Sequence, residues 1–166
     1  MIMRNKLYYF GFLFLVSFAL HSQSSTAGFV SNKAECLGTE LDGSMTLRSW
    51  GIGRNNSDAV EQAKKNAVAE VIFKGISVGQ SVCSRSPLLI DMGAEKKHEE
   101  YFATFFSDDG PYKEFVNLND EKIKHKIKRE KKKTDVSVTK SVIVRVNRLA
   151  LKKKLVADNI MLNYRD

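Results

Sequence analysis

The 166-residue chain has little proline, histidine, cysteine or tryptophan: two, three, two and one residues. Two prolines and ten glycines exclude a collagen-like or proline-rich disordered chain. The longest apolar run, Leu7–Leu20, is shorter than the ~20 residues that a membrane-spanning helix needs. With 43% hydrophobic and 28% charged residues the composition is that of a globular protein, and the length predicts one domain.

The sequence motifs of several enzyme classes are incomplete. Gly51 and Gly53 stand at the end of a predicted strand and before a predicted helix, where backbone N–H groups can hold a phosphate, but the third glycine of a dinucleotide-binding fingerprint is replaced by Asn56. We therefore interpret the two glycines as a turn. The segment His98–Glu100 begins like a zinc-protease helix, yet Phe102 stands where the second histidine is required.

Other catalytic candidates form no recognisable set. His125 lies in a predicted strand and is interpreted as a structural imidazole. The pairs Glu99–Glu100 and Asp108–Asp109 are adjacent in sequence, so we interpret them as a solvated helix face and a turn. Two cysteines without a histidine pair make no zinc site. We predict no catalytic residue, metal or cofactor, although a serine–histidine–aspartate site that assembles only in space leaves no sequence pattern.

The first 22 residues have the organisation of a secretory signal peptide. Arg4 and Lys6 precede the apolar segment Leu7–Leu20, and small polar residues follow it. We predict export, cleavage after Ser22 or Ala27, and no membrane span in the cleaved chain. An uncleaved N-terminal anchor is the alternative.

Cys36 and Cys83 are the two cysteines of the chain. An even number of cysteines in an exported domain favours a disulfide, and two buried free thiols are the alternative. Cys36 follows Leu20 by 16 residues, too far from the apolar segment to be a lipid-bearing cysteine.

Residues 23–43 have few apolar side chains and predict a flexible leader before a single α+β domain at residues 44–166. We expect a three- to four-stranded mixed or antiparallel sheet with helices packed on one face. The expected elements are a strand at 44–53, a helix at 57–75, a strand at 76–82, a helix at 95–106, a turn at 108–111, a hairpin of strands 119–128 and 136–146 with its turn at 129–134, and a helix capped by Asn147.

Two of these helices have informative apolar faces. Ser57 or Asp58 can cap the helix at 57–75, and alanines at positions 59, 63 and 67 form a stripe of small side chains that lets it lie close to a sheet. In the helix at 95–106 the aromatic residues recur at helical spacing, which favours core packing over a partner-binding patch. They are Tyr101, Phe102, Phe105 and Phe106.

The most unusual feature is the cationic run at residues 122–133, in which eight of twelve residues are Lys or Arg. Such a field attracts polyanions. Export argues against nucleic acid and favours anionic lipid headgroups, acidic glycans or an acidic protein surface. Lysines that guard a sheet edge are the alternative interpretation. The candidate contact residues are Lys122, Lys124, Lys126, Lys128, Arg129, Lys131, Lys132 and Lys133.

Residues 50–67, a Gly-x-Gly segment followed by a helix with Ala near every fourth position, resemble a superfamily of bacterial envelope proteins. It includes the N-terminal domain of the flagellar assembly protein FlgT and small outer-membrane lipoproteins. The resemblance covers mainly residues 45–75 and 136–160. It implies an α+β fold and a non-enzymatic envelope role. The chain differs from the lipoproteins in lacking their lipid-bearing cysteine and in its basic hairpin.

From these observations we expect an exported, non-enzymatic binding or assembly module of the periplasm or outer membrane, whose partner is an envelope protein or an anionic envelope surface. The alternative from another class is a small secreted hydrolase whose site is assembled only in space. A structural protein held to the envelope by charge is a third possibility. The sequence specifies no oligomeric state.

Overall fold

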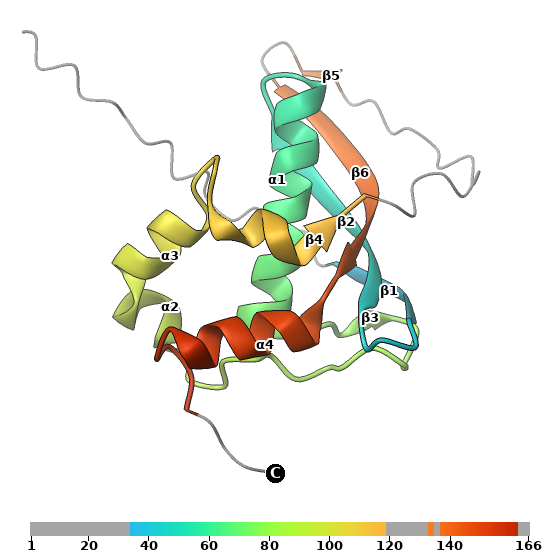
Figure 1. The fold of residues 1–166 in the computed structure, drawn as a ribbon. Coiled ribbons are helices and arrows are strands. Elements are labelled where there is room, and N and C mark those ends of the chain that lie inside the picture. Colours follow the sequence, from blue (N-terminus) through green and yellow to red (C-terminus); the bar gives the residue numbers. More distant parts are fainter. Residues whose placement is uncertain (1–33, 119–132, 135–136, 163–166) are drawn as a thin grey trace, which may run out of the picture.

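A computed structural model describes residues 34–118, 133–134 and 137–162, and it contains one mixed β-sheet with helices on one face (Figure 1). Five strands run in the order β3–β1–β2–β6–β4, and β5 pairs in addition with β6. The predicted α+β class is confirmed, but the sheet has five strands on its main path, with β5 in addition, rather than three to four. The strands are β1 Glu35–Thr39, β2 Met45–Gly53, β3 Val78–Gly79, β4 Val116–Asn117, β5 Lys133–Thr134 and β6 Ser137–Val146.

The helices in the described residues are α1 Asn56–Ala69, α2 Ala94–Lys97, α3 Glu99–Phe105 and α4 Arg148–Ala157, with a π-helical turn at Glu70–Lys74 and a 3-10 helix at Pro111–Phe115. The helix expected at 57–75 is thus α1 with its π-helical turn. Asn147 caps α4 as predicted, since its side chain accepts from the Ala150 N–H at 2.9 Å. None of these helices is long and apolar enough to span a membrane.

Three predicted elements differ from the structure. The helix expected at 95–106 is two helices, because His98 leaves helical geometry at φ −117° and ψ 35°. The strand expected at 76–82 is reduced to β3, whose two residues are exposed. The cap of α1 is Asn55, which accepts from the Asp58 N–H at 2.9 Å, rather than Ser57 or Asp58. The Asp58 carboxylate instead pairs with Arg54 at 2.9 Å.

Strands β2 and β6 form the centre of the sheet in an antiparallel register that runs from Met45–Val146 to Gly53–Val138. Side chains alternate along β2, so that Met45, Leu47 and Ser49 are buried beneath the helices. Val142, Val144 and Val146 of β6 lie opposite these three residues and are also buried. The alternating β-formers thus build the inner face.

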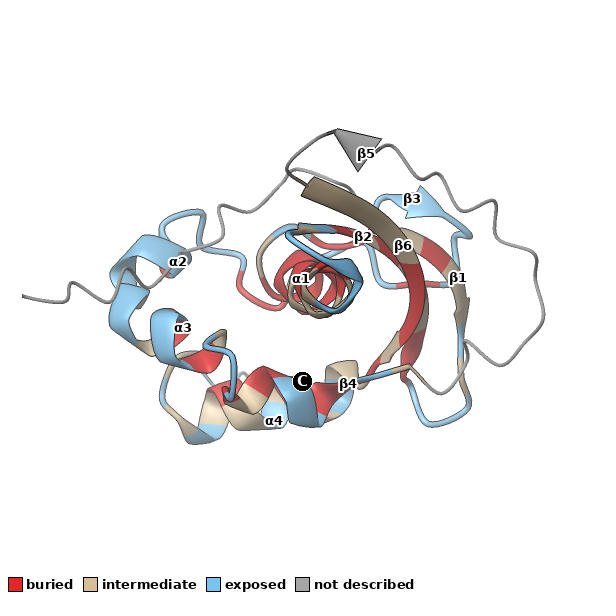
Figure 2. Ribbon diagram, turned by 90° about the horizontal axis from the view of Figure 1, so that it is seen from above, coloured by how far each residue is buried: buried red, intermediate tan, exposed pale blue. Residues whose placement is uncertain are grey.

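Helix α1 lies directly on this inner face, surrounded by buried segments (Figure 2). The approach is so close that a Cβ atom added at Gly51 would overlap the backbone of Ala59 and Ala63. The Asn66 side chain donates to the carbonyl of Trp50 at 2.8 Å and ties the helix to the strand. The stripe of alanines on α1 and the two glycines of β2 therefore together allow the helix to pack closely on the sheet.

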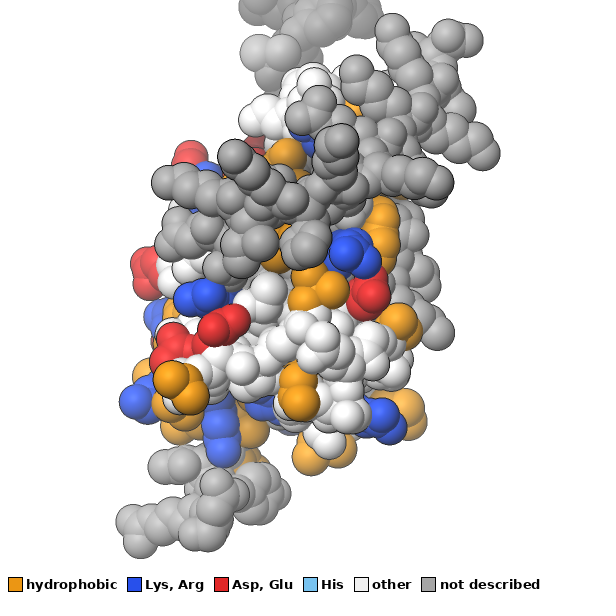
Figure 3. All heavy atoms as spheres, turned by 90° about the vertical axis from the view of Figure 1, so that its right-hand side faces the viewer, with side chains coloured by type: hydrophobic (Ala, Val, Ile, Leu, Met, Phe, Trp, Pro, Cys, Tyr) orange, Lys and Arg blue, Asp and Glu red, His pale blue; other side chains and the backbone are white. Residues whose placement is uncertain are grey.

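The outer face of the sheet carries both apolar and charged side chains (Figure 3). Arg48 of β2 pairs with Glu35 of β1 at 2.6 Å, and Arg145 of β6 pairs with Glu40 at 3.5 Å. Half-buried Trp50 lies on the same face of β2 as Arg48. Salt bridges that are partly open to solvent contribute little stability, so the inner face holds the fold together.

The sequence predicts a flexible leader at residues 23–43, but residues 34–43 contain β1 and the turn into β2. Residues 23–33 lie outside the described part of the chain. Strand β1 pairs with both β2 and β3, and its Cys36 forms a disulfide with Cys83, with 6.0 Å between the Cα atoms. Long-range pairing and a covalent bond order this segment, and neither can be inferred from its polar composition.

The connection from Gly75 to Gly93 is held at several points. After the disulfide, the N–H groups of Leu88 and Leu89 donate to the carbonyls of Val71 and Ile72 at 3.0 and 2.9 Å. These carbonyls belong to the last turn of the helix, where no further helical N–H follows. The connection thus completes the hydrogen bonding of the helix end.

We predict that Gly51→Ala lowers the free energy of unfolding by about 2–3 kcal/mol, because the added methyl group forces α1 away from β2. Gly38→Ala is the matched control, since no atom lies within 4 Å of a Cβ at that position. Urea unfolding of the two variants measures the difference. Equal unfolding midpoints would contradict the close packing.

We also predict that Cys36→Ser combined with Cys83→Ser costs about 4 kcal/mol, since the disulfide closes a loop over a sequence separation of 47 residues. Reduction of the unchanged chain should give the same loss. The measurement is urea unfolding with and without reductant, and an unchanged midpoint in both experiments would show that the connection is held without the disulfide.

Candidate functional site

The cationic candidates lie largely outside the described residues. These are Lys122, Lys124, Lys126, Lys128, Arg129, Lys131 and Lys132, and His125 lies outside as well. Lys133 belongs to β5, which pairs antiparallel with β6 in the register Lys133–Val138 and Thr134–Ser137. We expected residues 129–134 to form a turn, so the strand pairing includes two residues assigned to that turn.

The predicted disulfide between Cys36 and Cys83 is confirmed, and the alternative of two free thiols is wrong. Both residues are buried, at 1% and 3% exposure. The sulfur atoms therefore belong to the core at the place where β1 meets the connection after β3.

Gly51 and Gly53 lie within β2 and form no turn, because both residues pair with β6. The backbone of α1 stands where their side chains would be. The two glycines are therefore explained by packing, and no phosphate-binding role is needed to account for them.

His98 lies between α2 and α3 and is half-buried. It lines an open groove with its sequence neighbours Lys96, Lys97, Glu99, Glu100 and Tyr101, a set with no serine, threonine or cysteine. Glu99 and Glu100 are exposed, which agrees with a solvated helix face. The described residues contain no cluster of three potential metal ligands.

The Tyr101 hydroxyl donates to the Asp158 carboxylate at 2.6 Å. Burial, together with Asp158, raises the pKa of Tyr101 above its usual range. The hydrogen bond from Tyr101 and the ion pair with Lys154 outweigh burial and lower the pKa of Asp158. The phenol stays neutral and the carboxylate charged, so the pair joins α3 to the end of α4.

The aromatic stripe of α3 packs inward as predicted. Phe102 and Phe105 are buried, while Tyr101 and Phe106 are half-buried against the core. Phe105 stacks on Phe115 with 6.1 Å between the ring centroids. This stripe joins α3 to the 3-10 helix and leaves no aromatic patch on that helix face.

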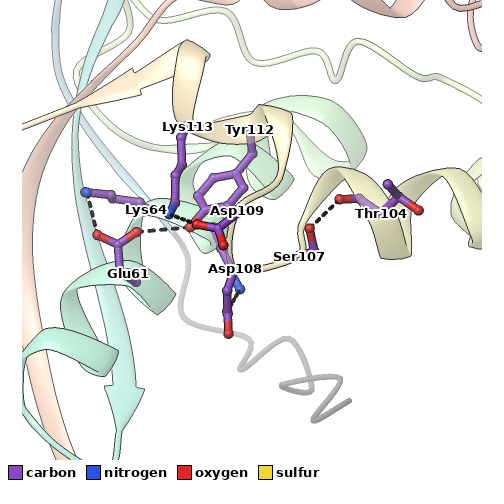
Figure 4. A network of polar contacts seen from close by, with 9 residues as sticks. Glu61, Lys64, Thr104, Ser107, Asp108, Asp109, Tyr112 and Lys113 are labelled. Carbon is purple, nitrogen blue, oxygen red and sulfur yellow. Dashed lines mark hydrogen bonds and ion pairs between the residues drawn. The ribbon is translucent and has the colours of Figure 1, made fainter. Parts of the chain in front are cut away.

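A second polar network joins α1 to the 3-10 helix (Figure 4). The hydroxyl of buried Tyr112 donates to Glu61 at 3.0 Å, and Lys64 pairs with the same carboxylate at 2.6 Å. Burial and the bond to Glu61 raise the pKa of Tyr112 above its usual range. Partial burial alone would raise the pKa of Glu61, but Lys64 and Tyr112 outweigh it and lower that pKa.

Two aspartates extend this network at the surface. Lys65 pairs with Asp108 at 2.9 Å and lies 5.5 Å from the ring centroid of Tyr112. Lys113 pairs with Asp109 at 3.4 Å. The hydrogen bond from Lys65 lowers the pKa of Asp108. The turn at Asp108–Asp109 is therefore as predicted, and its carboxylates are held by lysines of α1 and the 3-10 helix.

This network joins α1 to the 3-10 helix and to the turn before it. Its carboxylates accept from lysine or tyrosine, and its tyrosine is held in the neutral form. Sequence reasoning missed it because Glu61 and Tyr112 are 51 residues apart. The sequence places Tyr112 just after Gly110 and Pro111, but this position does not identify the residue that the tyrosine contacts.

The fold therefore defines an α+β domain with a central helix, a disulfide at one end and a strongly basic segment between β4 and β6. A search of protein-family models, curated proteins and solved structures finds no match to the chain.

We predict that Tyr112→Phe lowers the free energy of unfolding by about 1 kcal/mol at pH 7, because Glu61 loses a hydrogen bond. The pKa of Glu61 is lower in the folded than in the unfolded chain, so its stabilisation is present above the ordinary value of 4.5 and is lost as the pH falls through the lowered folded value.

The difference between variant and unchanged chain should consequently shrink below pH 4.5. Urea unfolding from pH 3 to 7 measures it. Lys113→Gln, which removes an exposed ion pair with Asp109 and only a minor charge effect on Glu61, is the control and should stay within about 0.5 kcal/mol of the unchanged chain. A difference that stays constant at all pH values would exclude Glu61 as the partner.

Proposed function

We propose that the chain is an exported, non-enzymatic binding or assembly module of the bacterial cell envelope. The observation that carries the proposal is the buried disulfide between Cys36 and Cys83, because structural disulfides persist in oxidising compartments outside the cytosol. The signal-peptide pattern of residues 1–22 supports the same location, in the periplasm or at the outer membrane.

The pairing of the titratable groups supports action by binding. The carboxylates of Glu61, Asp108 and Asp158 each accept from a lysine or tyrosine of the same domain. Carboxyl groups that act as general acids are often tuned to a pKa near neutral pH by burial. Here hydrogen bonds lower the pKa of all three, which suits a structural role.

The contact surface that we propose is the lysine-rich segment at residues 122–133, which is tied to the sheet at β5. The chain has a net charge of +8, and eight Lys or Arg residues are concentrated in these twelve positions. Such a density of charge raises the rate of encounter with anionic surfaces at low salt. The partner would be an acidic envelope protein or another anionic envelope component.

The resemblance to the envelope superfamily of FlgT supports this proposal through the order of elements. The segment from β2 into α1 and the segment from β6 into α4 occupy the two stretches, 45–75 and 136–160, on which the resemblance depends. We propose the relationship on this order and on the Gly-x-Gly and alanine pattern.

The experiment is a pull-down from bacterial envelope extract. Combined Lys→Glu changes at Lys122, Lys124, Lys126 and Lys128 should reduce partner recovery about tenfold or more, because they reverse the local field. Lys→Glu changes at the exposed Lys96 and Lys97 are the control and should retain the partner. Recovery should also fall with added salt. Unchanged recovery from the first variant would refute the contact assignment.

One observation favours a second candidate, a small secreted hydrolase. His98 shares its groove with two carboxylates, Glu99 and Glu100. The groove is open, however, and its lining holds no hydroxyl or thiol nucleophile except the phenol of Tyr101, which is bonded to Asp158. Hydrolysis of a generic ester or glycoside that disappears in His98→Ala would establish this function in place of the first.

A further inference from the structure

The segment between Ile76 and Leu88 is attached to the core through one residue. Ile76 and Leu88 are both buried, at 3% exposure, whereas ten of the eleven residues between them are exposed or half-buried. Cys83 is the exception, also at 3% exposure, and it reaches the core through its disulfide with Cys36. We call residues 77–87 the 77–87 loop. Its middle is fastened to the sheet by a covalent bond.

The base of the 77–87 loop is closed without the disulfide. Ile76 lies just past the π-helical turn that follows α1, and the Leu88 N–H donates to the carbonyl of Val71 in that turn at 3.0 Å. Arg148 also donates to the carbonyl of Ser86 near this base, at 2.9 Å. The two ends therefore lie close together, as in an Ω-loop. In Figure 1 the connection leaves the lower end of α1, passes β3 beside β1 and returns beneath α4.

The far side of the 77–87 loop is held to β1 by exposed contacts in addition to the disulfide. Strand β3 pairs with β1 over two residues. The Gln80 N–H donates to the carbonyl of Cys36 at 3.0 Å, and the Thr39 hydroxyl donates to the carbonyl of Val82 at 3.1 Å. Gln80, Thr39 and Val82 are exposed, so water can replace these hydrogen bonds at a small net cost.

We propose that the disulfide is a redox latch, whose reduction frees the 77–87 loop from β1 while the sheet and α1 stay folded. The reductant is a dithiol protein of the thioredoxin type. One of its thiolates attacks a sulfur of the disulfide and forms a mixed disulfide, which its second thiol then resolves. The dithiol is oxidised to a disulfide, and Cys36 and Cys83 each gain one electron and one proton.

The balance of burial and entropy favours release of the loop alone. A freed loop regains the backbone freedom of its residues. Cys83 is its one buried residue, so little apolar burial opposes the opening. Strand β1 stays in place, because it pairs with β2 from Glu35–Arg48 to Thr39–Met45. The base of the loop also keeps its backbone bond to the end of the helix.

The loop also gives a dithiol its route to the sulfur atoms. They are buried in the oxidised chain, but Val82 and Ser84 on either side of Cys83 are exposed. A local movement of this segment therefore brings the Cys83 sulfur to solvent. Such movements are least costly where few apolar contacts are buried and the backbone hydrogen bonds are exposed.

Release of the loop changes the edge of the sheet. Strand β3 is the outermost strand beside β1, so β1 becomes the edge when β3 leaves. Open edge strands accept strands from other chains. The oxidation state of the two cysteines therefore controls whether this edge is covered. The inference goes beyond the proposed function and uses none of the residues at 122–133, so each proposal can fail without the other.

The test is amide hydrogen exchange, measured by NMR on the oxidised chain and after reduction with dithiothreitol. The Gln80 amide should exchange about tenfold faster or more in the reduced chain, because its bond to Cys36 opens with the loop. The amides of Leu88, α1 and β2 should stay protected over the same time. Cys36→Ser combined with Cys83→Ser should reproduce the reduced pattern.

Trypsin cleavage provides a second measurement, since Arg85 is the one cleavage site in the loop. Cleavage after Arg85 should be about tenfold faster or more in the reduced chain. Cleavage after Lys64 within α1 is the internal control and should stay slow in both states. Arg85→Gln, which removes the site, identifies the product.

Three results would overturn the proposal. Unchanged exchange at Gln80 after reduction would show that the loop is held without the disulfide. Loss of protection in α1 and β2 together with Gln80 would show that the disulfide holds the whole domain rather than the loop. A disulfide that dithiothreitol leaves intact in the folded chain would show that the sulfur atoms are out of reach.

Discussion

The disulfide between Cys36 and Cys83 joins the first strand of the sheet to the long connection after β3. Most of that connection has no regular secondary structure, yet it completes the hydrogen bonding at the end of α1 and contacts α4 through Arg148. The covalent link holds it in place at the edge of a modest core. The bond forms under oxidising conditions, and it holds the connection after β3 against β1.

The second constraint is the small-residue contact between α1 and β2. Gly51 and Gly53 on the strand and the alanines at positions 59, 63 and 67 on the helix let two backbones approach closely. Other elements pack around α1 and β2. Strand β6 pairs with the edge of β2 that faces away from β1, and the 3-10 helix contacts α1 through Tyr112 and Glu61. The polar networks position these outer elements, which explains why their carboxylates are paired and their tyrosines neutral.

The local elements could be predicted from the sequence, and the long-range ones could not. Periodicity identified β2, α1, β6 and α4, since each has a core-facing pattern within its own residues. Strand β1 has no such pattern; it is ordered by β2 and by a cysteine more than forty positions away. Strands β3 and β4 have two residues each, too few for any periodicity. Of the candidate site, the disulfide was predictable from cysteine number and export. The Tyr112–Glu61 contact depends on tertiary structure alone, and most of the lysine-rich segment lies outside the described residues.

The central claim is that the chain is exported and folds with its two cysteines joined. The most direct measurement is thiol trapping in bacteria that produce the whole 166-residue chain, followed by mass analysis. We expect a product without the first 22 residues whose Cys36 and Cys83 react with an alkylating agent only after reduction. A product that retains its N-terminus and whose cysteines are both alkylated without reduction would contradict the claim.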